Sequence, residues 1–197
     1  NFTVNLSVLT ATALVSPLGS AALAGFGLGI RLEYLQIPIV FGVGAGLVAM
    51  VGMNTGAGQH VRARRVALTG ALLAAAVTSS IGMAAALFPR AWLGMFTQDA
   101  DAIRVGTLYL QIVGPAYGLF GLGLALYFAA QGARRMAFPL AAGLARLAVV
   151  FVAGHAAVRW GGGDLRLVLG AIVLGLVAYA GLNLLPWLRQ RSDGTAG

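Results

Sequence analysis

Six long stretches of this sequence carry almost no charged residues, and this feature limits the possible folds more than any other. Each is close to the length of about 20 apolar residues that a helix needs to cross a bilayer. Only 9% of the residues are charged, whereas soluble domains carry about 25%, so we exclude a soluble fold. The six predicted spans cover residues 1–18, 22–53, 66–89, 105–133, 136–158 and 167–188.

The spans are predicted to be helices rather than strands. No water is available inside a bilayer to satisfy backbone groups, so each span must form its hydrogen bonds internally. The sequence does not show the short alternating segments of a membrane β-barrel. We therefore predict an all-α integral membrane protein, a bundle of six transmembrane helices over residues 1–191, with a disordered tail at 192–197.

All 13 basic residues are arginine, and they are divided unevenly among the connections between spans. One side, including the C-terminal tail, holds seven arginines and one acid, whereas the other holds four arginines and three acids. Because positive residues accumulate on the cytoplasmic side, we predict a multi-pass protein of the cell (inner) membrane with both ends cytoplasmic. The net charge of +8 then reports orientation, and we expect no nucleic-acid partner.

Small residues four positions apart indicate close packing of helices in lipid. The glycine pairs with this spacing are Gly25/Gly29, Gly42/Gly46, Gly52/Gly56 and Gly114/Gly118. Pro38 and Pro115 lie inside the second and fourth spans, and each removes a backbone hydrogen bond, so we expect a bend or break at both. Broken helices are typical of transporters; a kink that serves only packing is the alternative.

Three charged side chains fall within the predicted spans: Arg31, Glu33 and Arg146. A charge at that depth costs about 2.5–3.5 kcal/mol on the insertion scale and suggests a functional role. Arg31 and Glu33 are two residues apart, so they point to different faces of a helix and cannot simply neutralise one another. We predict that Glu33 pairs with Arg146 on another span. The alternatives are a proton or cation site at Glu33, or a position near the membrane interface.

Neutral polar residues of the first, second and fourth spans are candidates for a transport pathway. Singly, each would hydrogen-bond another helix, at roughly 0.6 kcal/mol, whereas several facing one cavity would form a polar, aromatic-lined binding site. With Glu33, the candidates are Asn5, Gln36, Asn54, Gln111, Tyr117, Tyr127 and Gln131. We find no catalytic constellation, no cysteine and no metal-ligand spacing, so we expect neither an enzyme nor a cofactor or metal.

Several motifs resemble those of the multidrug and toxic compound extrusion (MATE) transporters. Residues 27–34 (Gly-Leu-Gly-Ile-Arg-Leu-Glu-Tyr), 37–38 and 51–58 are similar to the eighth helix of that family, and Glu33 matches its arginine-x-glutamate motif. The resemblance spans nearly the whole chain and continues through residues 62–65, 92–96, 109–115 and 129–132. It implies a twelve-helix protein of two lobes, of which this chain is the second, six-helix lobe.

This resemblance implies half of a secondary active antiporter that exports drugs or organic cations in exchange for H⁺ or Na⁺ by alternating access. The implied partners are small organic cations, the lipid bilayer and the missing N-terminal lobe of the same protein. The positions that carry Na⁺ in one branch of the family fall near residues 4–5 and near Gly121, where no acid stands. Coupling to H⁺ through the first lobe is therefore the favoured expectation.

The sequence leaves two other functions open. A flippase for lipid-linked saccharides would share the architecture, but its cavity should hold many more cationic residues than Arg31 and Arg146. A non-transporting membrane scaffold would need no broken helices, so straight helices at Pro38 and Pro115 would favour it.

Overall fold

The computed structural model describes residues 2–160, 162 and 164–189, with side chains from residue 5 on, and the secondary-structure elements among them are all helices. They are α1 (Phe2–Val15), η1 (Ser16–Leu18), α2 (Ser20–Gly56), α3 (His60–Leu87), α4 (Pro89–Leu93), α5 (Ala100–Val113), η2 (Gly114–Ala116), α6 (Tyr117–Gly132), α7 (Ala137–Trp160) and α8 (Leu165–Arg189). The tail predicted at 192–197 lies outside the described residues.

Five helical segments of the described chain are long and apolar enough to cross a membrane. They are α2, α3, the segment Ala100–Gly132 from α5 through α6, α7 and α8. The first predicted span corresponds to a shorter apolar helical segment, Asn5–Leu18. The predicted all-helical membrane bundle is therefore confirmed, with a first helix shorter than the others.

The helix ends differ most from expectation around the third and fourth spans. α3 begins at His60, six residues before the predicted start, because arginines can stay helical near an interface while their charged heads reach water. The fourth span begins at Ala100, where the side chain of Asp99 caps α5 by accepting a hydrogen bond of 3.0 Å from the Asp101 amide.

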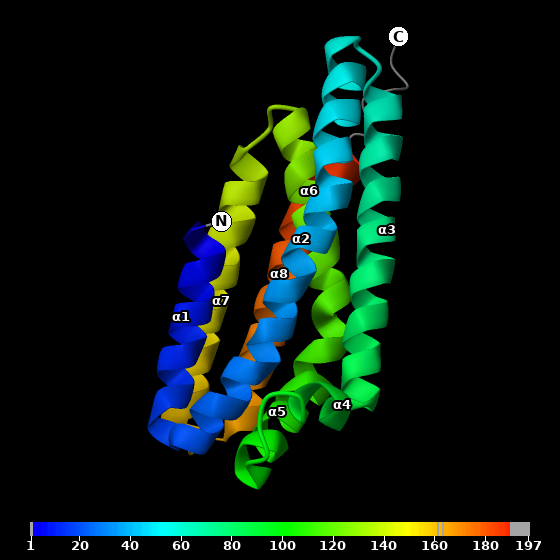
Figure 1. Ribbon diagram of the computed structural model, residues 1–197. Helices are drawn as coiled ribbons and strands as arrows, with labels where there is room; N and C mark the ends of the chain where they lie inside the picture. Colours follow the sequence, from blue (N-terminus) through cyan, green and yellow to red (C-terminus); the bar gives the residue numbers. More distant parts are fainter. Residues whose placement is uncertain (1, 161, 163, 190–197) are drawn as a thin grey trace.

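The helices form two groups that meet along α8 (Figure 1). α1 and α7 lie side by side on one flank and form what we call the α1–α7 pair, and α7 also packs extensively on α8. On the other flank, α2, α3, α5 and α6 pack on one another, and α5 and α6 contact α8. Since α7 scarcely touches α2 or α6, the α1–α7 pair is attached to the rest of the bundle mainly through α8.

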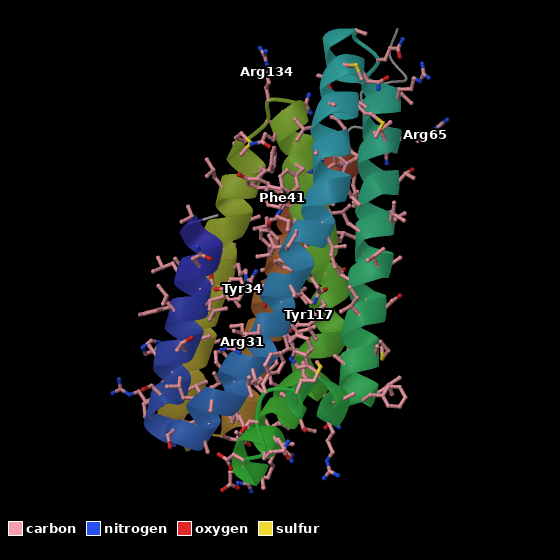
Figure 2. The ribbon with its side chains drawn as sticks, viewed as in Figure 1. Arg31, Tyr34, Phe41, Arg65, Tyr117 and Arg134 are labelled. Atoms are coloured by element: carbon pink, nitrogen blue, oxygen red, sulfur yellow. The ribbon has the colours of Figure 1, made fainter. Side chains whose placement is uncertain are left out.

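The arginine-rich connections lie together at one end of the bundle. The α2–α3 and α6–α7 turns are at the upper end of Figure 1, whereas η1 and α4 are at the lower end. Figure 2 places Arg65 and Arg134 at this upper end, which we call the arginine-rich end. The acids Asp99 and Asp101 belong to the start of α5, at the opposite end. The fold therefore separates the connections as the charge pattern predicts.

Glycines allow the closest backbone contacts, and two of the four predicted pairs take part in them. Gly25 and Gly29 face α5, and a Cβ built on Gly25 would lie 2.4 Å from the Ala102 carbonyl oxygen. Gly114 and Gly118 face α3, where a Cβ on Gly82 would lie only 2.0 Å from the Gly114 carbonyl oxygen. A side chain at these positions would therefore force α2 from α5, or α3 from the α5–α6 segment.

Of the other two pairs, Gly42/Gly46 does not have the predicted role, and in Gly52/Gly56 only Gly52 has it, since its Cβ would lie 3.4 Å from the Gly132 carbonyl oxygen of α6. A Cβ on Gly42 or Gly56 would meet nothing within 4 Å, and one on Gly46 would approach only the Met50 side chain. The buried face of α2 at this level is instead that of Gly44, whose Cβ would collide with the Phe128 ring of α6. Gly42, Gly46 and Gly56 stand on or beside the exposed side of α2, so for these three glycines spacing alone gave the wrong face.

The two prolines differ in their effect on the helices. Pro115 lies in η2, where the α-helix is interrupted between α5 and α6, so the predicted break is present. Pro38 lies inside α2, which stays α-helical on both sides of it. Its ring is on the exposed face, while Gln36 and Val40 beside it are buried, and the packing holds α2 as one helix.

Candidate functional site

The centre of the bundle contains an ion pair between α2 and α7. Arg146 Nη2 donates to Glu33 Oε1 at 2.8 Å. The two side chains are only 3% and 5% exposed. The other salt bridge among the described side chains, Arg104 with Asp101, is largely exposed. Glu33 is thus joined to the partner expected from the sequence, and α2 is linked to a helix that it scarcely touches otherwise.

The guanidinium of Arg146 lies between two aromatic rings. Its Cζ is 5.9 Å from the ring centre of Phe120 on α6 and 5.9 Å from that of Tyr179 on α8. Both distances are within the range of a cation–π interaction. Gly175 allows α8 to approach this part of α7, since its Cβ would lie 2.8 Å from Val150 and 3.4 Å from the Arg146 carbonyl oxygen. Residues of α2, α6, α7 and α8 therefore position the Arg146 guanidinium.

Arg146 keeps hydrogen-bonding capacity that Glu33 does not use. Its Nε and Nη1 are buried and have no hydrogen-bond partner among the described residues. A cavity of about 10 Å³ is lined in part by Ser7, Glu33, Tyr109 and Arg146. This is room for about one water molecule. The geometry is that of a neutralised, tightly enclosed pair rather than of an open binding pocket.

A second cluster holds α2 against the α5–α6 segment just below the pair. The Tyr117 hydroxyl donates to the Gly29 carbonyl oxygen at 3.2 Å. The Tyr109 ring packs where a Cβ on Gly29 would stand and meets the Phe26 ring edge-on, with the ring centres 5.4 Å apart. These tyrosines fix the position of α2 along its axis relative to η2. Figure 2 shows Tyr117 beside α2.

The neutral polar candidates are not gathered in one cavity. Of the pathway candidates, Glu33 alone lines the cavity beside Arg146. Gln36 is fully buried and donates to the Leu32 carbonyl oxygen of its own helix at 3.2 Å, and Asn54 bonds the Met50 carbonyl oxygen at 2.7 Å. The rest lie apart from it: Tyr117 is buried against α2, Tyr127 is half-buried, and Asn5, Gln111 and Gln131 are exposed.

Sequence reasoning missed several residues that surround the pair: Ser7, Tyr109, Phe120 and Tyr179. The available signal was the position of the tyrosines. Tyrosine in membrane proteins is enriched at the interface, yet Tyr109 and Tyr179 stand well inside their helices. A tyrosine at that depth is a sign of an internal polar partner or of a nearby charge.

A family model described as MatE matches residues 1–154 of the chain. The chain belongs to the MatE family. Its members are membrane transporters, which agrees with the apolar helices of the fold.

Two relatives of this MatE chain have transporter names. The probable multidrug resistance protein NorM of Thermotoga maritima is 29% identical over 135 residues, which are 68% of this chain and 28% of the relative. The FAD transporter of Shewanella oneidensis is 24% identical over 140 residues, 71% of this chain and 31% of the relative. The chain thus matches less than one third of the length of these relatives.

Solved structures show the same fold. A crystal structure of MATE in the bent conformation matches with a TM-score of 0.83 at 16% identity, over 92% of this chain and 41% of that one. A MOP-superfamily transporter from Pyrococcus furiosus, whose title reports a binding pocket of reverse polarity, matches with a TM-score of 0.83 at 16% identity, over 96% and 42%. The described bundle therefore has the fold of part of a MATE transporter.

The arginine-x-glutamate motif of this MatE chain sends its two charges to opposite faces of α2, as its spacing predicts. Glu33 points inward to Arg146, whereas Arg31 is exposed and forms no ion pair with a described residue. The Arg31 guanidinium lies 5.6 Å from the ring centre of Phe96. The segment between α3 and α5, which contains Phe96, is held to α2 by Trp92, whose indole N–H donates to the Leu28 carbonyl oxygen at 3.0 Å.

The described residues contain no group of three or more His, Cys, Asp or Glu side chains that could hold a metal ion. The acids of the described chain outside the buried pair are exposed: Asp99, Asp101 and Asp164. The chemistry available in this part of the chain is therefore charge pairing, aromatic contact and close helix packing.

Proposed function

We propose that this chain is the C-terminal lobe of a secondary active antiporter that exports small organic molecules, organic cations foremost, by alternating access. In that mechanism two lobes rock against each other around a site between them. The proposal needs an N-terminal lobe of matching size, a lipid bilayer around both, and no cofactor.

The observation that carries the proposal is a bundle with the MATE fold whose helices are joined by buried contacts. Rocking requires each lobe to move as one body. The ion pair between Glu33 and Arg146 ties α7 to α2, and the glycine contacts bring α3 and the α5–α6 segment together at backbone distance. The helix break at Pro115 argues against a passive scaffold, which would need no interrupted helix.

Proton coupling through the N-terminal lobe is part of the proposal. Glu33 is the buried acid of the described residues, and its carboxylate is held by Arg146. The chain has a neutral residue, Gly121, near one position where the Na⁺-coupled branch carries an acid, and its Cβ would meet the Thr78 side chain at 2.2 Å. Space for a carboxylate is therefore lacking there, which favours H⁺ over Na⁺.

The proposed orientation is that of an inner-membrane protein with both ends of the chain in the cytoplasm. Its support is the collection of arginines at one end of the bundle (Figure 2), since positive residues accumulate on the cytoplasmic side. In this orientation α4 and the start of α5 lie on the outer side.

A second candidate substrate is a flavin dinucleotide, as in the name of the Shewanella relative. The observation that favours it is the exposed Arg31 over the Phe96 ring, since an unpaired arginine beside an aromatic side chain suits an anionic aromatic molecule. A saccharide flippase is less favoured, because Arg146 is neutralised by Glu33 and leaves few cations for a polyanion.

The test is transport by the full-length protein in proteoliposomes. A fluorescent organic cation and FAD are offered separately, each with a pH gradient, with a Na⁺ gradient and with neither. We expect the organic cation to move against its gradient when the pH gradient is present. Movement of FAD alone would favour the second candidate, and no movement of either molecule with either gradient would count against the antiporter.

A further inference from the structure

The arginine-rich end contains a groove that the transport proposal does not use. It lies between the last turns of α2 and the turn from α6 to α7, and it has a volume of about 410 Å³. This is within the size range of small-molecule sites. Its lining residues are Gly52, Thr55, Gly56, Gly132, Ala133 and Arg134, and Figure 2 shows Arg134 projecting from the bundle there.

The backbone at Arg134 has an unusual conformation. α6 ends in a Schellman motif, in which the Arg134 amide donates to the Gln131 carbonyl oxygen at 3.1 Å and the Arg135 amide to that of Ala130 at 2.9 Å. Arg134 occupies the left-handed position with φ of 57°, and it is the only non-glycine residue with positive φ in the described chain. Such a position favours glycine, since a Cβ is strained there.

The end of α2 shows what the same turn looks like without this strain. There the Gly58 amide donates to the Thr55 carbonyl oxygen at 3.1 Å, and the Gln59 amide to that of Asn54 at 2.8 Å. The left-handed residue is Gly58, with φ of 72°. Arginine in the equivalent position of α6 therefore carries a backbone cost, which points to a use for its side chain.

The polar groups of the groove have no partners within the described chain. The Arg134 guanidinium forms no hydrogen bond or ion pair with a described residue. The Thr55 hydroxyl forms none either, whereas those of Thr10, Thr12 and Thr78 bond the carbonyl oxygen four residues back. No acid lines the groove. One residue with an unpaired cation and one with a free hydroxyl thus line the same groove.

The charge around the groove has one sign. The arginines of the α2–α3 and α6–α7 turns lie at this end, and the described acids lie elsewhere, at Glu33 inside the bundle and at Asp99, Asp101 and Asp164 near its other end. Arg64 donates to the Trp187 carbonyl oxygen and Arg62 to the Gln59 side-chain oxygen, and neither of them lines the groove. The charge around the groove therefore favours an anion as its occupant.

We propose that this groove binds the phosphate of an anionic phospholipid from the adjacent leaflet, with Arg134 and Thr55 as its direct contacts. Arginine and hydroxyl groups donate charge-assisted hydrogen bonds to phosphate, and basic pockets between membrane helices recognise lipid head groups. A lipid is favoured over free phosphate because Met50 and Met53 of the same turns of α2 are exposed and offer an apolar surface to its acyl chains.

The test measures lipid retention rather than transport, so its result does not depend on the proposed function. The full-length protein is purified from membranes of phosphatidylcholine with phosphatidylglycerol, and bound lipid is counted by native mass spectrometry during stepwise delipidation. We expect Arg134→Gly and Arg134→Asn to weaken phosphatidylglycerol binding about tenfold or more, as loss of a charge-assisted hydrogen bond implies. Both replacements tolerate the left-handed backbone, so the protein should still fold.

The matched control is Arg65→Ala, which removes an exposed arginine of the same end that does not line the groove. Thr55→Val should weaken binding by less than Arg134→Gly, and phosphatidylcholine binding should not change. Equal loss of phosphatidylglycerol in the Arg65 and Arg134 variants would overturn the proposal. So would full displacement of the lipid by millimolar inorganic phosphate, or a loss of stability in Arg134→Gly that is the same with and without phosphatidylglycerol.

Discussion

Removing the charge of Glu33 tests whether the central ion pair is as buried as the structure shows. Glu33→Gln has nearly the same shape but leaves the Arg146 cation without its counter-charge between side chains that are 3% and 5% exposed. Breaking a buried pair in this way costs about 3–5 kcal/mol. The amide oxygen can still accept the 2.8 Å bond from Nη2, so we expect the low end, about 3 kcal/mol or roughly a 150-fold change in the folding equilibrium.

The assay is reversible unfolding of the full-length protein in mixed micelles, followed by circular dichroism as the denaturing detergent is increased. Arg146→Met should cost a similar amount, because it leaves the carboxylate buried alone. The double variant Glu33→Gln with Arg146→Met leaves no unpaired charge but does leave a buried amide without its partner. We expect it to cost about 1–3 kcal/mol, which is less than the sum of the two single costs.

The matched control is Asp101→Asn, which breaks the pair with Arg104 whose side chains are 79% and 67% exposed. Exposed pairs contribute about 0–1 kcal/mol, so this variant should scarcely shift the transition. A cost of Glu33→Gln no larger than that of Asp101→Asn would show that the pair is not buried in this way. Single costs that simply add in the double variant would show that the two side chains do not interact.

Three further predictions use the same preparations. Gly82→Ala should cost about 1–3 kcal/mol of unfolding free energy, because its Cβ would lie 2.0 Å from the Gly114 carbonyl oxygen. The control Gly170→Ala should be neutral or stabilising, because its Cβ would meet nothing within 4 Å. Equal effects of the two substitutions on stability would contradict this prediction. Trp92→Phe loses a hydrogen bond of 3.0 Å to α2 and should cost about 0.5–1.5 kcal/mol, and an unchanged transition would show that water replaces it. Pro115→Ala restores a helical amide at η2 and should lower transport in proteoliposomes without lowering stability, whereas native transport rates would show that the break is dispensable.

The features that the sequence predicted well are those that depend only on the order of residues along the chain, such as the positions of the membrane-spanning helices. An apolar run of the required length must be a helix, and the helices were found wherever such runs occur. The pairing of Glu33 with Arg146 could be predicted for a related reason. Few ionisable groups lie within the spans, and a carboxylate at that depth requires a cation.

The features that the sequence did not predict depend on which face of each helix is buried. In a soluble helix the polar residues mark the solvent face, but lipid and protein interior are both apolar, so this signal is weak here. Gln36 is buried, whereas Gln111 and Gln131, of the same type, are exposed. Gly44 contacts the Phe128 ring, whereas Gly42 and Gly46, with the expected spacing, do not. Only the arrangement of neighbouring helices decides between them.

The central ion pair has structural importance because it joins helices that little else joins. α7 rests on α1 and α8 and scarcely touches α2, and the small cavity lies in the remaining space between them. Two long side chains can span such a gap where backbones and apolar side chains do not meet. Loss of the pair should therefore loosen the α1–α7 pair from α2 before it affects the glycine contacts of α3 with α5 and α6. In the proposed transport mechanism the lobe moves as one body, and this link then acts at the place where its packing is thinnest.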